Sequence, residues 1–230
     1  MAKKLAVIGL GHFGSQLATE LSRMGAEVLA IDDDMDRLDD IKDKVTHSVR
    51  LDATELKPLQ SQGLDEFDAV IIGIGDNFEA TLLVTAVLQQ IGVKRIIVRA
   101  TTPVHERILN HLGINEVILP SAEAAERLAT SLMFEKVVDS FALSTDFTIV
   151  EVSAPESYVG KTLEELQLPR RLELSVITIK RTRTTPRLFG ISKKTTEEIV
   201  GIPKPDTVVE RGDILVVFGA KSALQRMLEL

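Results

Sequence analysis

Residues 5–14 read LAVIGLGHFG, an apolar run that passes directly into glycines spaced as G-x-G-x-x-G. This pattern is typical of a strand, a tight turn and the start of a helix. Gly9 permits the turn, Gly11 lets the phosphates of a ligand approach the backbone, and Gly14 lets the helix pack close to the strand. Free N–H groups and the positive end of a helix starting near Phe13 favour an anion. The stretch therefore predicts a nucleotide site.

Short runs rich in Val, Ile and Leu recur through the first two thirds of the chain. They are too apolar for half-exposed strands, which indicates a parallel sheet covered on both faces. The runs lie at residues 5–10, 27–32, 47–52, 69–74, 95–100 and 116–120. Stretches with helical spacing separate them, and another helix is expected from Ser121 to about Asp139. Six strand–helix units in series predict a doubly wound α/β lobe of the Rossmann type.

The pattern changes in the last third of the chain. Strand-like runs lie at 147–152, 174–181 and 213–219, and helix-like runs lie at 160–168 and 220–230. Glycine and proline interrupt the rest. We expect a second, smaller α+β domain of about eighty residues, a size that supports its own core.

Two further features point to the same ligand as the glycines. The second strand ends at Asp32, whose carboxylate can bind both ribose hydroxyls and would repel a 2′-phosphate, so NADP is disfavoured. In a sheet ordered 3-2-1-4-5-6 the ligand crevice opens between strands one and four. The loops GIGDN (73–77) and LDAT (51–54) both follow strands of this sheet. Three loops thus converge on one crevice, which predicts an adenine nucleotide.

The composition restricts the class of protein. The net charge of −7 argues against a nucleic-acid-binding protein, and the absence of cysteine excludes disulfides and thiolate metal sites. No apolar stretch approaches the roughly 18 residues needed to cross a bilayer, and the N-terminus reaches glycine too early for a signal peptide. The sequence therefore predicts a cytoplasmic protein.

No residue pattern marks catalysis. All four histidines lie in the first domain, and the second domain has neither His nor Cys. A hydride-transferring enzyme needs an acid or base near its cofactor. We therefore expect no catalytic residues and favour a nucleotide sensor. The alternative is an NAD-dependent oxidoreductase that uses the same glycines and Asp32.

The motifs GLGHFGSQLATEL, AIDDD, LDAT, IGIGDNFEA and RIIVRA resemble those of the RCK (regulator of K⁺ conductance) family. They are most similar to the peripheral regulatory subunits of Trk and Ktr potassium-uptake systems. GKTLEELQL and VVERGDILVVFG extend the resemblance over nearly the whole chain, and the presence of one such unit rather than two favours the Ktr type.

The resemblance implies a cytosolic gating subunit. Such subunits form a ring, commonly an octamer, on the inner face of the membrane beneath a membrane-embedded potassium-translocating subunit. Nucleotide binding changes the shape of the ring, and the ring gates ion flux. The implied domains are 1–139 for the nucleotide-binding lobe with its crossover helix, 140–146 for a hinge, and 147–230 for a regulatory lobe. A detached gating module of a potassium channel is a further alternative.

The resemblance also assigns the ligand and the site. It implies ADP or ATP, with NAD(H) as the alternative. The implied binding residues are Gly9, Gly11, His12, Phe13, Gly14, Asp32, Asp33, Asp52, Ala53, Thr54, Gly75, Asn77 and Arg99. His12 replaces an arginine that is common in the family, which predicts weaker or pH-dependent discrimination between ATP and ADP. Ser121 follows Pro120 where the Ktr pattern tends to have glutamate, so we expect no metal site.

Overall fold

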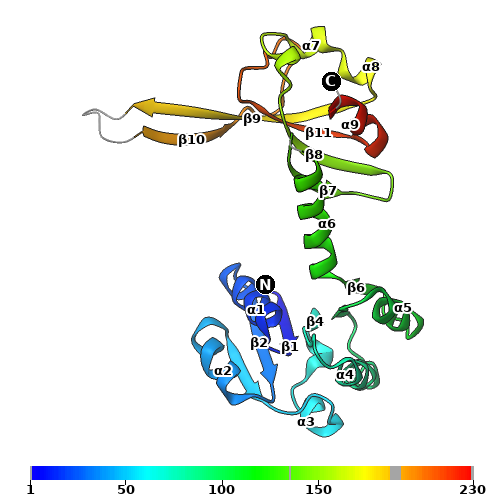
Figure 1. The fold of residues 1–230 in the computed structure, drawn as a ribbon. Helices are drawn as coiled ribbons and strands as arrows, with labels where there is room; N and C mark the ends of the chain where they lie inside the picture. Colours follow the sequence, from blue (N-terminus) through cyan, green and yellow to red (C-terminus); the bar gives the residue numbers. More distant parts are fainter. Residues whose placement is uncertain (1, 135, 187–192, 229–230) are drawn as a thin grey trace. The chain divides into compact units, whose positions relative to one another are not determined.

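A computed structural model describes residues 2–134, 136–186 and 193–228 of the chain. The chain folds as two compact units, Met1–Ser121 and Ala122–Leu230 (Figure 1). None of the helices in the described ranges combines the length and apolarity that crossing a bilayer requires. The finer division into 1–139, 140–146 and 147–230 stays a prediction.

The first unit is built on a parallel sheet with the order β3-β2-β1-β4-β5-β6. Its strands are β1 Lys4–Ile8, β2 Glu27–Asp32, β3 His47–Arg50, β4 Ala69–Ile72, β5 Ile96–Arg99 and β6 Glu116–Ile118. Its helices are α1 His12–Arg23, α2 Met35–Ile41, α3 Leu56–Gln60, α4 Phe78–Ile91 and α5 Pro103–His111, with short 3-10 helices at Lys42–Lys44 and Leu64–Glu66. The doubly wound fold and its strand order are confirmed.

Both faces of this sheet are buried, which explains the apolar runs in the sequence. Successive strand residues point to opposite faces. On β1, Ile8 belongs to a core cluster that includes Leu88 of α4. Its neighbour Val7 belongs to a separate cluster with Ala18 of α1 and Leu38 of α2. The sheet therefore fixes where each loop leaves its edge.

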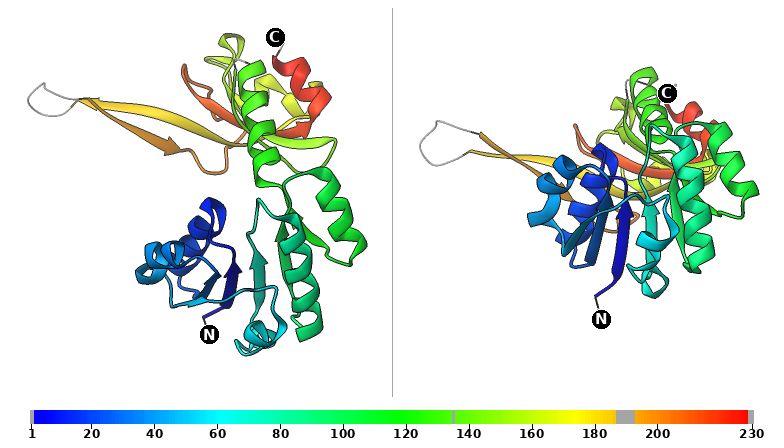
Figure 2. Two further views of the ribbon diagram at one scale, coloured as in Figure 1. Left: turned by 60° about the horizontal axis from the view of Figure 1, so that its bottom comes forward. Right: turned by 90° about the horizontal axis from the view of Figure 1, so that it is seen from below.

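The second unit contains an antiparallel sheet with the order β10-β9-β11-β8-β7. Its strands are β7 Val137–Ala142, β8 Phe147–Ser153, β9 Ser175–Pro186, β10 Lys193–Ile199 and β11 Ile214–Ala220. Its helices are α6 Pro120–Met133, which begins at the end of the first unit, α7 Leu163–Leu166, α8 Leu168–Arg171 and α9 Lys221–Leu228, with a short 3-10 helix at Glu156–Tyr158. The predicted smaller α+β lobe is confirmed. In both views of Figure 2 the strands β9 and β10 project as a two-stranded ribbon.

The sequence-based helix limits are wrong at two places in the second unit. The helix expected from Ser121 to about Asp139 ends at Met133, and Asp139 lies in β7. The buried Val137 anchors β7 to β8, so tertiary pairing outweighs the local helical pattern. The helix expected over 160–168 is interrupted at Gln167, whose φ of 48° is left-handed. The last two residues of the helix expected over 220–230 lie outside the described residues.

Candidate functional site

At the glycine loop the backbones of β1, α1 and β4 lie very close to one another. Gly9 has a φ of +87°, a conformation that favours glycine. A Cβ atom on Gly14 would lie 1.9 Å from the carbonyl oxygen of Gly9, and one on Gly73 would lie 2.9 Å from the same oxygen. The Gly73 N–H also donates to the Ile8 carbonyl at 2.7 Å. Side chains at Gly14 or Gly73 would therefore push β1, α1 and β4 apart.

Gly11 lies in a different environment. It is the N-cap residue of α1 with a φ of −60°, and a Cβ atom there would meet nothing within 4 Å. No described side chain caps the start of this helix, while the neighbouring His12 is exposed. The start of α1 therefore has open space at Gly11 and no side-chain cap, an arrangement that phosphate groups use at helix N-termini.

Asp32 holds the glycine loop against the end of β2. Its side chain is almost fully buried, and its Oδ2 accepts a hydrogen bond from the Leu10 N–H at 2.5 Å. Its Oδ1 accepts from the Asp34 N–H at 2.9 Å, and Arg37 lies 3.5 Å from Oδ2. A carboxylate offers about four lone-pair sites, so it can still accept from ribose hydroxyls. The neighbouring Asp33 is exposed.

The loop after β3 is held by its own side chains. Asp52 Oδ1 accepts hydrogen bonds from the Thr54 hydroxyl at 2.6 Å and the Thr54 N–H at 2.9 Å. These bonds, the hydroxyl first, lower the pKa of Asp52 below its ordinary value. Ala53 between them is buried in the core of the first unit. Hydrogen bonds within the loop therefore fix the position of the Asp52 carboxylate.

The loop after β4 and the start of α1 both meet Arg99 at the end of β5. A Cβ atom on Gly75 would lie 2.7 Å from Arg99 Nη1, so a larger residue at this position would require the guanidinium to shift. Arg99 Cζ lies 5.4 Å from the centroid of the Phe13 ring, a distance at which a cation is attracted to the ring. The buried Arg99 Nε has no hydrogen-bond partner in the described structure. Asn77 begins α4, where its Oδ1 accepts from the Ala80 N–H at 3.0 Å.

The predicted residues thus fall into three contact groups of the first unit. Gly9 and Gly14 meet at the turn, Asp52 with Thr54 forms a separate loop, and Phe13, Gly75 and Arg99 come together. The described residues contain no group of three or more His, Asp or Glu side chains arranged to hold a metal ion. The absence of a metal site stays a prediction.

Sequence reasoning missed an aromatic pair at the starts of α4 and α5. The rings of Phe78 and His105 stack with centroids 3.7 Å apart and an angle of 7° between their planes. The Thr101 hydroxyl lies 2.9 Å from His105 Nδ1. The two rings lie in the first turns of α4 and α5, which follow neighbouring strands. The spacing of the two residues in the sequence does not predict that they touch. Only the strand order, which makes β4 and β5 neighbours, brings the starts of α4 and α5 together.

Comparison with known proteins shows matches in both units. Residues 5–120 match the model of the TrkA-N domain, and residues 147–230 match that of the TrkA-C domain. The chain is 32% identical over 226 residues to Ktr system potassium uptake protein C of Bacillus subtilis, covering 98% of this chain and 96% of the relative. It is also 32% identical to Ktr system potassium uptake protein A of the same organism, covering 97% and 95%.

Solved structures show the same fold at lower identity. The RCK domain of GsuK covers 100% of this chain with a TM-score of 0.64 and 19% identity, although this chain spans only 48% of that chain. A structure of the GsuK channel bound to NAD covers 99% with a TM-score of 0.63 and 18% identity, and this chain spans 40% of it. At these identities the likeness establishes the fold alone.

Proposed function

This chain belongs to the family of proteins built from a TrkA-N and a TrkA-C domain, and on that basis we propose that it is a nucleotide-binding regulatory subunit of a potassium uptake system. The resemblance to Trk and Ktr subunits predicted from the motifs is confirmed. The relatives named as Ktr potassium uptake proteins align over nearly their whole length, which supports a role shared by the whole chain rather than by one lobe.

The observation that carries the proposal is the open space at Gly11 beside the cluster of Phe13, Gly75 and Arg99. Phosphates bound at the start of α1 would accept hydrogen bonds from its free N–H groups. Arg99 has a buried nitrogen available for a further charge-assisted bond. Ribose would bind to Asp32, and adenine would lie against the Asp52–Thr54 loop.

The ligand we propose is ADP or ATP, with NAD(H) as the alternative. The GsuK channel structure bound to NAD shares this fold, which supports a nucleotide of this general size. His12 stands at the exposed start of α1, where a ring N–H can donate a hydrogen bond to the phosphates.

The proposed role is gating rather than catalysis. A ligand shifts a conformational equilibrium only as far as it binds one state better than the other. We propose that the chain assembles into a ring, that nucleotide binding to the first lobe selects one ring shape, and that the ring acts on a membrane-embedded potassium-translocating subunit from the cytoplasmic side. The segment 140–146 is the proposed hinge between a lobe of residues 1–139 and a lobe of residues 147–230.

Potassium flux into liposomes tests this proposal. The membrane subunit is reconstituted alone, with the wild-type chain, with Gly11→Val, and with Gln16→Val as a matched change on the exposed side of α1. We expect flux to respond to ADP and ATP with the wild type and Gln16→Val, and to lose that response with Gly11→Val.

Two results would count against the gating role. One is flux that ignores the chain altogether. The other is steady consumption of NADH by the purified chain with a carbonyl substrate, which would favour the oxidoreductase alternative.

A further inference from the structure

The outer part of the β9–β10 ribbon is a two-stranded structure with an open edge. Residues 175–180 of β9 pair with β11, but residues 181–186 pair only with β10 among the described residues. β10 is the edge strand of the sheet, and the ribbon projects from it (Figure 1). A two-stranded ribbon is marginally stable in water, and an exposed edge presents backbone groups to another strand.

The register shows which backbone groups of β10 face outward. The Val200 N–H donates to the Ile179 carbonyl at 2.9 Å, and Lys193 lies opposite Pro186, which has no N–H. In an antiparallel pair, hydrogen-bonded and non-hydrogen-bonded positions alternate. Residues 194, 196 and 198 therefore bond to β9. Residues 193, 195, 197 and 199 direct their N–H and C=O groups away from it.

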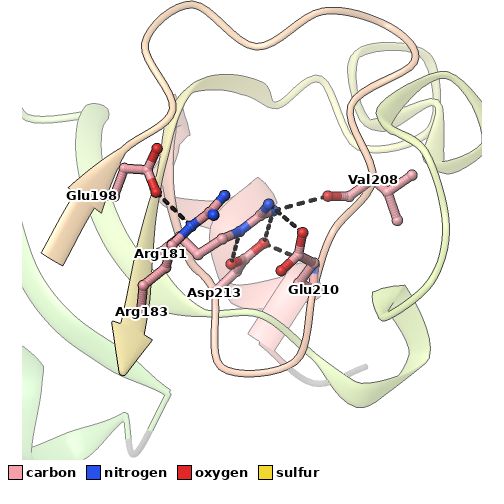
Figure 3. Close-up of polar contacts among 6 residues, drawn as sticks. All are labelled: Arg181, Arg183, Glu198, Val208, Glu210 and Asp213. Carbon is pink, nitrogen blue, oxygen red and sulfur yellow. Dashed lines mark hydrogen bonds and ion pairs between the residues drawn. The ribbon is translucent and has the colours of Figure 1, made fainter. Parts of the chain in front are cut away.

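The sequence of β10 is self-complementary in charge when it is read in the antiparallel direction. Residues 193–198 read KKTTEE. In the register with β9, Pro186 lies opposite Lys193 and Thr185 lies opposite Lys194. Figure 3 shows that the arginines of the ribbon already have acidic neighbours, Glu198 for Arg183 and Asp213 with Glu210 for Arg181.

We propose that β10 pairs antiparallel with β10 of a second copy of this chain, joining two five-stranded sheets into one. Backbone geometry restricts the register, because each outward-facing residue must lie opposite an outward-facing residue. One allowed register sets Thr196 opposite Thr196 of the partner subunit. Lys194 then lies opposite Glu198 of the partner subunit. On the other face Lys193 occupies the position diagonal to Glu197 of the partner subunit.

This pairing gives hydrogen-bond partners to the outward-facing backbone groups of β10. It also favours a second copy of the chain over other strands. Lysines on an edge strand discourage pairing with neutral or basic strands. The proposed register sets each Lys194 at the position opposite a glutamate, so a second copy is complementary in charge where most other strands are not. The proposal concerns the C-terminal unit only and does not depend on nucleotide binding.

Cysteine crosslinking tests the register directly, because the wild-type chain contains no cysteine. In the proposed pair Thr196 lies opposite itself at a non-hydrogen-bonded position, where Cα atoms are about 4.5 Å apart, within the range that a disulfide spans. Two copies of Thr195 would be about 8 Å apart, which is too far. Under mild oxidation we expect Thr196→Cys to form a covalent dimer quickly and Thr195→Cys to do so at least tenfold more slowly.

Two second-site variants in the Thr196→Cys background separate pairing from random collision. Thr195→Pro removes an outward N–H and leaves the bonds to β9, so we expect it to abolish the dimer. Lys194→Glu sets two glutamates opposite each other and should slow the dimer about tenfold, and adding Glu198→Lys should restore it. The exposed Arg183–Glu198 pair contributes little to stability, so this swap leaves the ribbon intact.

Three outcomes would overturn the proposal. Equal crosslinking at positions 195 and 196 would indicate collision between mobile ribbons. Faster crosslinking at 195 than at 196 would overturn the proposed register, because it would place Thr195 opposite itself and Lys194 opposite Thr196 of the partner subunit. Crosslinking at 196 that persists with Thr195→Pro would show that β10 does not pair through its backbone.

Discussion

Replacing Gly14 by alanine tests the backbone contact on which the site is built. The new Cβ atom would lie 1.9 Å from the Gly9 carbonyl oxygen, and real Cβ contacts under 3.0 Å essentially do not occur. The helix α1 must therefore move away from β1 by more than 1 Å, about the amount by which the contact is too short. Overpacking of this kind typically costs about 1–3 kcal/mol and occasionally more. Because the atom that is met belongs to the backbone, we expect about 3 kcal/mol.

Gly11→Ala is the matched control on the same loop. Its Cβ atom would enter open space at an ordinary φ of −60°, so we expect stability to change by no more than about 0.5 kcal/mol. With about 2–4 °C per kcal/mol, Gly14→Ala should melt about 6–12 °C below the wild type. Differential scanning calorimetry without nucleotide measures both variants. If Gly14→Ala melts at the wild-type temperature, or if Gly11→Ala lowers the melting temperature as much as Gly14→Ala, then Gly14 is not the glycine required for packing on this loop.

Two further predictions concern ion pairs of the second unit. Arg181→Met leaves the fully buried carboxylate of Asp213 unpaired and should lower the free energy of unfolding by about 3–5 kcal/mol. Arg183→Met, on the same strand but in an exposed pair, should change it by less than about 1 kcal/mol, and urea unfolding that gives equal losses would contradict the account (Figure 3). The hydrogen bond from Arg127 holds the pKa of Asp139 below its ordinary 3.8, so this pair stabilises the folded state above that pH and ceases to do so as the pH falls through the lowered pKa. Asp139→Asn should therefore be less stable than the wild type at pH 7 and converge with it as the pH falls below the lowered pKa. A stability gap that is independent of pH would exclude this contribution.

Most of the first unit was predictable because its sequence patterns and its buried contacts agree. Both faces of the sheet are covered, so each strand is a continuous apolar run, and the glycines after β1 fix the turn into α1. The contact between Gly75 and Arg99 was predictable only as a convergence of loops at one edge of the sheet. Its distances depend on side-chain packing that no spacing rule contains.

The second unit was less predictable for a physical reason. β7 begins at Val137, where long-range pairing with β8 overrides a locally helical pattern. β10 has six consecutive polar residues, so it lacks the alternation of apolar and polar residues that identifies a strand. The stacked rings of Phe78 and His105 are joined by tertiary structure alone.

Native mass spectrometry with ADP, ATP and NADH measures nucleotide binding at the glycine loop. We expect the wild type and Gln16→Val to retain one adenine nucleotide per chain and Gly11→Val, folded by circular dichroism, to retain none. Arg99→Met should bind about ten- to a hundredfold more weakly, since it loses a charge-assisted hydrogen bond. Undiminished binding by Gly11→Val would place the nucleotide elsewhere, and a wild-type chain that retains no nucleotide would contradict the account.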